Sequence, residues 1–167
     1  ELGVLQGFSL LTGASALRDN GAGRVNGFDL FEAYPSHHEH YAALVERIRE
    51  CGLTRWASAE RLDAFEASQR FDTVDVLHVD ISNNGETYRT IFEQWATKVT
   101  ALMILEGGSA DRDRVEWMIK YQKPSITNAL EEIRSRYPTW DLVVLEPYPS
   151  VTVAVRRECA NPGQLRP

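Results

Sequence analysis

Two apolar runs that each end in an acidic residue constrain the fold of this chain most strongly. They are Val74–Asp80 and Ala101–Glu106. Runs of this length with few polar residues are typical of strands buried on both faces of a sheet. Between them, residues 86–99 place apolar side chains at helical i, i+3, i+4 spacing. A strand, a helix and a second strand in this order predict a parallel sheet covered by helices.

The rest of the chain extends this alternation. Helices are expected over 8–19, 37–51, 58–68, 110–121 and 125–137, and strands over 24–31, 53–57, 140–146 and 150–157. Pro147-Tyr148-Pro149 joins the last two strands, and so short a link requires an antiparallel hairpin. The sequence therefore predicts an α/β fold: a Rossmann-like, doubly wound, mostly parallel sheet with helices on both faces and a C-terminal antiparallel hairpin. We expect one domain over 1–157 and a polar tail over 158–167.

Composition narrows the function classes. The net charge of −6 and the scattered positions of the 18 Lys and Arg argue against nucleic acid as a partner. Two cysteines form neither a disulfide framework nor a metal knuckle, which fits a reducing compartment. The sequence shows no apolar run of membrane-spanning length and no signal peptide. We expect a cytoplasmic protein with no membrane partner, and the oligomeric state, a homo-oligomer included, is left open.

The first residues of the chain suit a ligand that contains adenosine. Gly3 and Gly7 have no side chain, so a ligand can approach the backbone closely. The helix expected after Gly7 offers unpaired N–H groups and a positive dipole end. Asp29 follows on the next strand, where a carboxylate can accept hydrogen bonds from ribose hydroxyls.

The pattern E-x-G-x-x-x-G from Glu1 to Gly7, followed by Asp29, resembles motifs I and II of class I S-adenosylmethionine-dependent methyltransferases. The sheet of that family also finishes in an antiparallel hairpin. The resemblance implies transfer of a methyl group from S-adenosylmethionine to a small-molecule substrate, at a hydroxyl of a natural product or sugar. It also implies that the family's first, central strand ends at about Glu1, so that the body of this strand lies upstream of residue 1.

Two other functions are compatible with the same elements. One is a different Rossmann-like enzyme that uses a nucleotide, which a GxGxxG motif would favour, and this motif is absent. The other is a methyltransferase-like domain without activity that serves in binding or assembly.

The resemblance implies a set of cofactor-binding residues at the carboxyl ends of the strands: Glu1, Gly3, Gly7, Asp29, Ser58, Ala59 and Asp80. The first three would surround the methionine portion of the cofactor. Asp29 would bind the ribose hydroxyls, and Ser58 and Ala59 fall where the family contacts the adenine edge. Asp80 would face the methionine portion or the reaction centre.

Asp80 and Glu106 are candidates for catalysis and for a magnesium site. They end consecutive strands, so they are neighbours in a parallel sheet. The resemblance extends to catechol-type and sugar O-methyltransferases, which place magnesium-binding acids at these positions and hold a substrate hydroxylate there. This sequence departs from that pattern, because Glu106 stands where Asp is usual and Gly107 where Asp or Asn is usual. The alternative is that Asp80 orients the cofactor and Glu106 caps a helix or bonds substrate.

A histidine cluster gives one more catalytic candidate. His37, His38 and His40 follow Asp29 closely, in the first turn of a helix expected to begin with a Ser36/Glu39 capping box. His40 is the candidate general base at the rim of the site, since an imidazole titrates near neutral pH. The alternative is a solvated first helical turn.

Two polar segments after the apolar strands also have two interpretations. The Ser82–Gly85 loop is either a turn or a group of side chains that bond sugars or water. Arg112 and Arg114 either contact an anionic substrate or lie in a solvated helix start.

Overall fold

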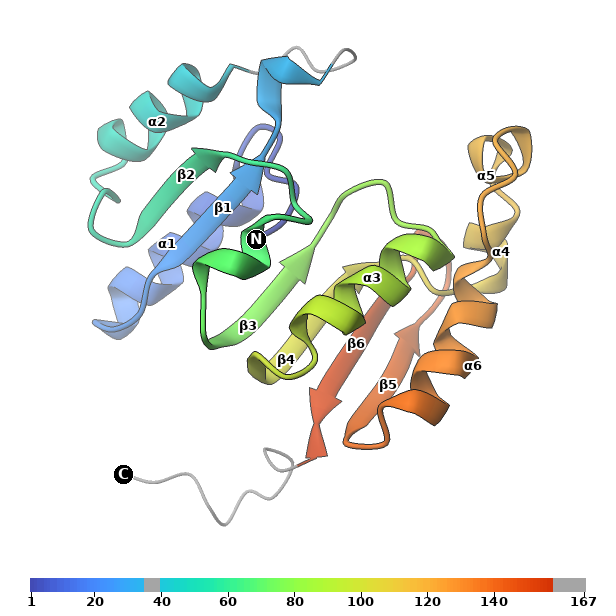
Figure 1. Ribbon diagram of the computed structural model, residues 1–167. Coiled ribbons are helices and arrows are strands. Elements are labelled where there is room, and N and C mark those ends of the chain that lie inside the picture. The colour runs from blue at the N-terminus through green and yellow to red at the C-terminus, as the bar shows by residue number, and fades with distance from the viewer. Residues whose placement is uncertain (35–39, 158–167) are drawn as a thin grey trace. The chain divides into compact units, whose positions relative to one another are not determined.

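The computed structural model describes residues 1–34 and 40–157, which fall into two compact units, Glu1–Arg70 and Phe71–Pro167 (Figure 1). Each unit has its own sheet, two-stranded in the first unit and four-stranded in the second. The expected tail over 158–167 lies outside the described residues. The expectation of one domain over 1–157 stays a prediction.

Unit 1 contains the elements that follow the glycine-containing turn. These are α1 (Phe8–Asn20), β1 (Val25–Asp29), η1 (Phe31–Ala33), α2 (Tyr41–Glu50), β2 (Ala57–Arg61) and η2 (Ala67–Arg70). β1 and β2 pair in parallel, with Asp29 opposite Arg61 at their carboxyl ends. Leu2 forms a parallel bridge to Phe28, where the Phe28 amide donates to the Glu1 carbonyl and the Gly3 amide donates to the Phe28 carbonyl, both at 2.9 Å. The backbone before the turn therefore runs alongside β1 as the end of a strand does.

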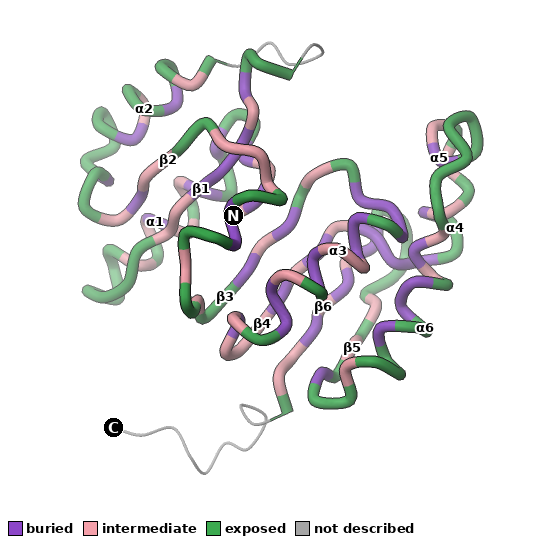
Figure 2. The backbone as a smooth tube through the Cα atoms, viewed as in Figure 1, coloured by how far each residue is buried: buried purple, intermediate pink, exposed green. Residues whose placement is uncertain are grey.

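The apolar core of unit 1 joins both helices to the sheet (Figure 2). Its buried members are Val4, Leu10, Ala14, Phe31, Leu44, Ile48, Leu53 and Ala57. The expected helix over 8–19 is confirmed as α1, and Gly21 ends it in the left-handed conformation. The described part of the second helix begins at Tyr41, so the Ser36/Glu39 capping box lies outside the described residues.

The expected strand over 53–57 and helix over 58–68 are wrong. Leu53 lies in a turn, where its carbonyl accepts the amides of Trp56 and Ala57 at 2.8 Å, and the strand begins only at Ala57. Leu53 is apolar because it packs in the core at this turn. β2 is only partly buried and ends in polar residues, so its apolar and polar residues do not alternate regularly. The sequence pattern therefore predicts a helix where the structure has a strand.

Unit 2 contains a mixed sheet, with both parallel and antiparallel strand pairs. Its elements are β3 (Val74–Val79), α3 (Gly85–Trp95), β4 (Val99–Glu106), α4 (Ala110–Asp113), α5 (Glu116–Lys120), α6 (Ile126–Arg136), β5 (Trp140–Leu145) and β6 (Val151–Arg156). The strand order is β3-β4-β6-β5, with β3 and β4 parallel and β6 antiparallel to both of its neighbours. The predicted C-terminal hairpin is confirmed, and α3 packs against α6 over the sheet (Figure 1).

The single helix expected over 110–121 is two short helices, because Asp113 turns away to cap α6. Its Oδ1 accepts the Ile126 amide at 2.6 Å, and its Oδ2 accepts the Thr127 amide at 3.0 Å and the Ser125 hydroxyl at 2.7 Å. Burial raises the pKa of Asp113, but these hydrogen bonds, with that of the Thr127 hydroxyl, outweigh burial and lower the pKa below its ordinary value of 3.8.

This cap makes stability depend on pH. A carboxylate whose pKa is lowered by folding stabilises the protein above its unfolded pKa, and this contribution disappears as the pH falls through the folded pKa. We expect Asp113→Asn to reduce the free energy of unfolding by about 1–2 kcal/mol at pH 7. The gap from wild type is expected to shrink below a pH of about 4.

Urea unfolding between neutral and acidic pH checks this expectation. Asp111→Asn is the matched control, since Asp111 lies on the same helix with an exposed side chain, 3.8 Å from Arg114. An equal loss in both variants would show that the Asp113 cap contributes nothing specific.

Candidate functional site

Unit 1 carries a tight turn between Gly3 and Gly7, which directly precedes α1. Both glycines have positive φ, at +82° and +81°, a conformation that other L-residues rarely adopt. The turn is closed by the Gly7 amide, which donates to the Val4 carbonyl at 2.8 Å. A Cβ at Gly7 would lie 2.3 Å from Leu44 Cδ1. Glycine at residue 7 is therefore favoured by its positive φ and by the close approach of Leu44 in the core.

The Asp29 carboxylate holds this turn in place. Its Oδ2 accepts the amides of Val4 at 2.7 Å and Leu5 at 2.9 Å, and its Oδ1 accepts the Phe31 amide at 2.8 Å. Asp29 is buried, at 7% exposure. The acid expected to bind ribose therefore also fixes the backbone of the turn. Glu1 reaches the start of α1, where the Ser9 hydroxyl donates to its Oε1.

The placement of Ser58 and Ala59 at the end of a strand is wrong. They lie early in β2, paired with Asn26 and Gly27, and the Ser58 hydroxyl donates to Asn26 Oδ1 at 2.8 Å. The residues that reach the carboxyl end of β2 are Arg61 and Leu62, whose amide donates to the Asp29 carbonyl at 3.1 Å. The displacement follows from the wrong strand boundaries, and contact of Ser58 and Ala59 with adenine stays a prediction.

Unit 2 brings Asp80 and Glu106 together, as the sequence predicted. β3 and β4 pair with Val79 opposite Leu105, so the next residue on each strand is an acid at the same edge. Burial raises the pKa of Glu106, Arg112 opposes this rise, and Asp80 adds to it through its charge and a side-chain hydrogen bond. The two carboxyl groups thus form one acidic pair, here called the Asp80–Glu106 pair.

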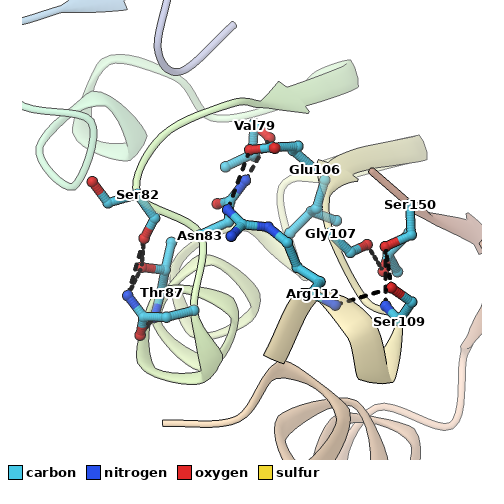
Figure 3. A network of polar contacts seen from close by, with 12 residues as sticks. Val79, Ser82, Asn83, Thr87, Glu106, Gly107, Ser109, Arg112 and Ser150 are labelled. Carbon is cyan, nitrogen blue, oxygen red and sulfur yellow. Dashed lines mark hydrogen bonds and ion pairs between the residues drawn. The ribbon is translucent and has the colours of Figure 1, made fainter. Parts of the chain in front are cut away.

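Arg112 is a functional candidate whose burial the sequence did not indicate (Figure 3). It is buried, at 6% exposure, and its guanidinium lies 3.7 Å from Glu106 Oε2 and over the Trp117 ring at 5.1 Å from the ring centre. Ser109 caps α4, with its hydroxyl 3.3 Å from the Arg112 amide. The interpretation of Arg112 as part of a solvated helix start is wrong. The Ser109 capping signal and Gly107 were the only sequence hints.

Hydrogen bonds from neighbouring strands and helices fix the backbone after β4 (Figure 3). The Gly107 amide donates to the Ser150 carbonyl at 2.7 Å, and the Thr152 hydroxyl donates to the Gly107 carbonyl at 2.9 Å. The Tyr88 hydroxyl donates to the Glu106 carbonyl at 3.2 Å, and burial raises the pKa of this tyrosine. The phenol therefore stays neutral, and the acidic pair is attached to a rigid backbone.

The polar side chains of Asn83 and Asn84 in the Ser82–Gly85 loop form hydrogen bonds with the backbone of the loop and of the residues next to it. Asn84 caps α3, with its Oδ1 accepting the Glu86 amide at 2.9 Å and its Nδ2 donating to the Ser82 carbonyl at 3.0 Å. Asn83 is fully buried and donates to the Val79 carbonyl at 3.2 Å. Among the described residues, its Oδ1 and the Arg112 Nε have no hydrogen-bond partner.

His40 is exposed at the start of α2 and makes no side-chain cap there. His37 and His38 lie outside the described residues. A role for His40 as a general base stays a prediction.

Comparison with known proteins decides the family. The family described as "Methyltransferase domain" matches residues 1–104, more than half of the chain. This chain belongs to that methyltransferase family. The match includes the Gly3–Gly7 turn, Asp29 and Asp80, so the resemblance found in the sequence is confirmed. A different Rossmann-like nucleotide-using enzyme is thereby set aside.

Solved structures share the fold of this methyltransferase. The O-methyltransferase from Bacillus cereus in complex with SAH has 16% identity and a TM-score of 0.68, covering 93% of this chain and 71% of that one. A putative caffeoyl-CoA O-methyltransferase from Staphylococcus aureus has 13% identity, a TM-score of 0.67 and coverages of 93% and 73%. The O-methyltransferase TomG from Streptomyces achromogenes, in complex with SAM, has 13% identity, a TM-score of 0.68 and coverages of 93% and 70%. These matches confirm the Rossmann-like fold class.

The search of curated proteins found no match. Within residues 1–34 and 40–157, the methyltransferase contains no helix long and apolar enough to cross a membrane.

The side chains of the Asp80–Glu106 pair do not fit a magnesium ion well. In the described part of the chain, no group of three or more His, Cys, Asp or Glu is placed to hold a metal ion. Gly107 contributes no side chain, and the Arg112 guanidinium already lies beside Glu106. A divalent cation bound to Glu106 would be repelled by this guanidinium.

Proposed function

We propose that this methyltransferase binds S-adenosylmethionine at the Gly3–Gly7 turn of unit 1 and methylates a hydroxyl of a small molecule. The observation that carries the proposal is the Asp29 carboxylate, which ties the turn to the end of β1 directly before α1. The SAH and SAM complexes of two proteins with this fold support the choice of cofactor.

The side chains of unit 1 fit such a cofactor. Its ribose hydroxyls and methionine ammonium group are hydrogen-bond donors, and the Asp29 and Glu1 carboxylates, which contact the turn and the start of α1, are acceptors. The amino end of α1, a helix of 13 residues, adds a positive dipole end for the methionine carboxylate. When bound, the sulfonium of the cofactor supplies an electrophilic methyl group.

The protein's part in this reaction is to position the groups and to accept a proton. The acceptor oxygen forms a bond to the methyl carbon, the bond from that carbon to sulfur breaks with its electron pair going to sulfur, and the hydroxyl proton leaves to a base. Asp80 is our candidate for this base, because its carboxylate is exposed at the end of β3. His40 is the second candidate. Holding the reactants aligned supplies most of the rate enhancement in such a displacement.

The class of acceptor is proposed from the related folds. Three of the similar structures are named O-methyltransferases, one of them a putative caffeoyl-CoA O-methyltransferase and one involved in tomaymycin synthesis. A hydroxylated natural product or a sugar fits this group. A methyltransferase-like binding domain is the competing function, and Gly107, which stands where Asp or Asn is usual, is compatible with it.

Titration calorimetry with S-adenosylhomocysteine tests the cofactor proposal. We expect one molecule to bind per chain with micromolar affinity. NAD is the control ligand, and it is expected not to bind because GxGxxG is absent. No heat from S-adenosylhomocysteine at high micromolar concentration would overturn the proposal. Binding without methylation of any hydroxylated compound in a broad panel would favour the binding domain.

A further inference from the structure

The Asp80–Glu106 pair has a cation supplied by the protein itself. Arg112 places its guanidinium 3.7 Å from Glu106 Oε2, and the arginine side chain is 8% exposed. A guanidinium stays protonated at any pH at which proteins are folded. The positive charge beside Glu106 is therefore permanent.

Gly107 and Arg112 depend on each other in space. A Cβ at residue 107 would lie 3.2 Å from Arg112 Cγ, 3.6 Å from Arg112 Nε and 3.0 Å from Ile126 Cδ1. Gly107 also has a φ of +100°, where a side chain is strained. An acidic or amide side chain at residue 107 would crowd Arg112 and Ile126, so the missing ligand and the buried cation belong to one arrangement.

The arginine is held in this position from several sides. Its own amide is bonded within the Ser109 cap, and Ser109 is bonded to Ser150, with the two hydroxyl oxygens 2.9 Å apart. The Trp117 ring covers the guanidinium. The stacking and the burial of the side chain oppose displacement of the guanidinium by a metal ion.

We propose that the Arg112 guanidinium replaces a divalent metal ion as the counter-cation of the Asp80–Glu106 pair, and that methyl transfer by this domain needs no divalent metal. Arg112 is thus a positioning residue that neutralises Glu106 and keeps the acidic pair in place. The role of Arg112 in catalysis rests on the proposed function, whereas the arrangement of charges around Glu106 does not.

Binding of Mn²⁺, measured by electron paramagnetic resonance of the free ion, tests this proposal. We expect the wild-type protein to show no stoichiometric Mn²⁺ site at millimolar concentration. Arg112→Met removes the cation beside Glu106, and it is expected to bind Mn²⁺ at least about tenfold more tightly than wild type. Glu106→Gln added to that variant is expected to remove the gain.

Arg114→Met is the matched control, because Arg114 follows the same short helix with a side chain that is 76% exposed. It is expected to behave as wild type, and so is Arg112→Lys, which keeps a cation. A wild-type Mn²⁺ site that Glu106→Gln abolishes would overturn the proposal, and this comparison remains decisive if Arg112→Met does not fold. Folded Arg112→Met with unchanged Mn²⁺ affinity would also overturn it.

Calorimetry with S-adenosylhomocysteine, with and without EDTA, separates this proposal from the proposed function. Binding that is equal with and without EDTA supports the cofactor assignment alone. A failure of S-adenosylhomocysteine to bind overturns the cofactor assignment, while the Mn²⁺ result still decides the role of Arg112.

Discussion

Asp29→Ala is expected to weaken S-adenosylhomocysteine binding at least about tenfold, on the order of 1.4 kcal/mol for a lost charge-assisted hydrogen bond. The same change is expected to lower the free energy of unfolding by about 2–4 kcal/mol. It removes the acceptor of the Val4, Leu5 and Phe31 amides, and Asp29 is buried, so water replaces the carboxylate poorly. Calorimetry and urea unfolding on the same protein samples give the two values.

Two further variants separate the roles of this carboxylate. Asp29→Asn keeps an amide oxygen as acceptor but loses the charge, so we expect a smaller loss of stability and a comparable loss of affinity. Asp19→Ala is the matched control, because Asp19 lies near the end of α1 with a side chain that is 70% exposed, paired to Arg18. If folded Asp29→Ala binds the ligand as tightly as wild type, the ribose does not lie at this carboxylate.

Strong local signals made the second half of the fold predictable. Val74–Val79 and Val99–Glu106 are mostly apolar runs, which predicted both strands correctly. The expectation that both faces are buried is wrong for β3, where Val76 is 53% exposed. Two prolines in a three-residue link left a hairpin as the only connection between the last strands. The acids that end β3 and β4 followed from this sheet, so the Asp80–Glu106 pair was predictable too.

β2 was not predictable in the same way, because its residues carry a weak pattern. Leu53 is buried at a turn and Ser58 lies within the strand, so apolar character and strand position do not coincide. The pairing of β2 with β1 fixes the strand, and such pairing is a tertiary effect that overrides local propensity. Because the boundaries of this strand were predicted wrongly, the residues expected to contact adenine lie within β2 and not after its end.

The detailed contacts of the site depend on backbone geometry that periodicity does not encode. Asp29 was expected to bind a ribose, but its bonds to the Val4 and Leu5 amides arise from the direction in which the turn points its N–H groups. Arg112 was expected near a helix start, but it is buried, and a Cβ at residue 107 would crowd it. The acids at the ends of β3 and β4 could be predicted from the sequence, whereas the end of β2 and the partners of each side chain required coordinates.

Gly85→Ala is expected to reduce the free energy of unfolding by about 3 kcal/mol, an overpacking effect at the start of α3. A Cβ at Gly85 would lie 2.2 Å from the Ser125 carbonyl oxygen and 3.0 Å from the Pro124 carbonyl oxygen. These are backbone atoms that cannot rotate away, and the Gly85 amide donates to the Pro124 carbonyl at 2.7 Å. α3 would have to move away from the start of α6, which Asp113 holds in place.

Gly13→Ala in α1 is the matched control for this glycine, since a Cβ there meets nothing within 4 Å. Its expected effect has the opposite sign, a gain of about 0.5–1 kcal/mol from higher helix propensity. Urea unfolding of the two variants measures both values. If both alanines change stability in the same direction, close packing against the Ser125 carbonyl is not the reason for glycine at residue 85. A loss confined to Gly85→Ala would show that contact between α3 and the start of α6 helps to fix the loop after Asp80, together with the hydrogen bonds of Asn83 and Asn84.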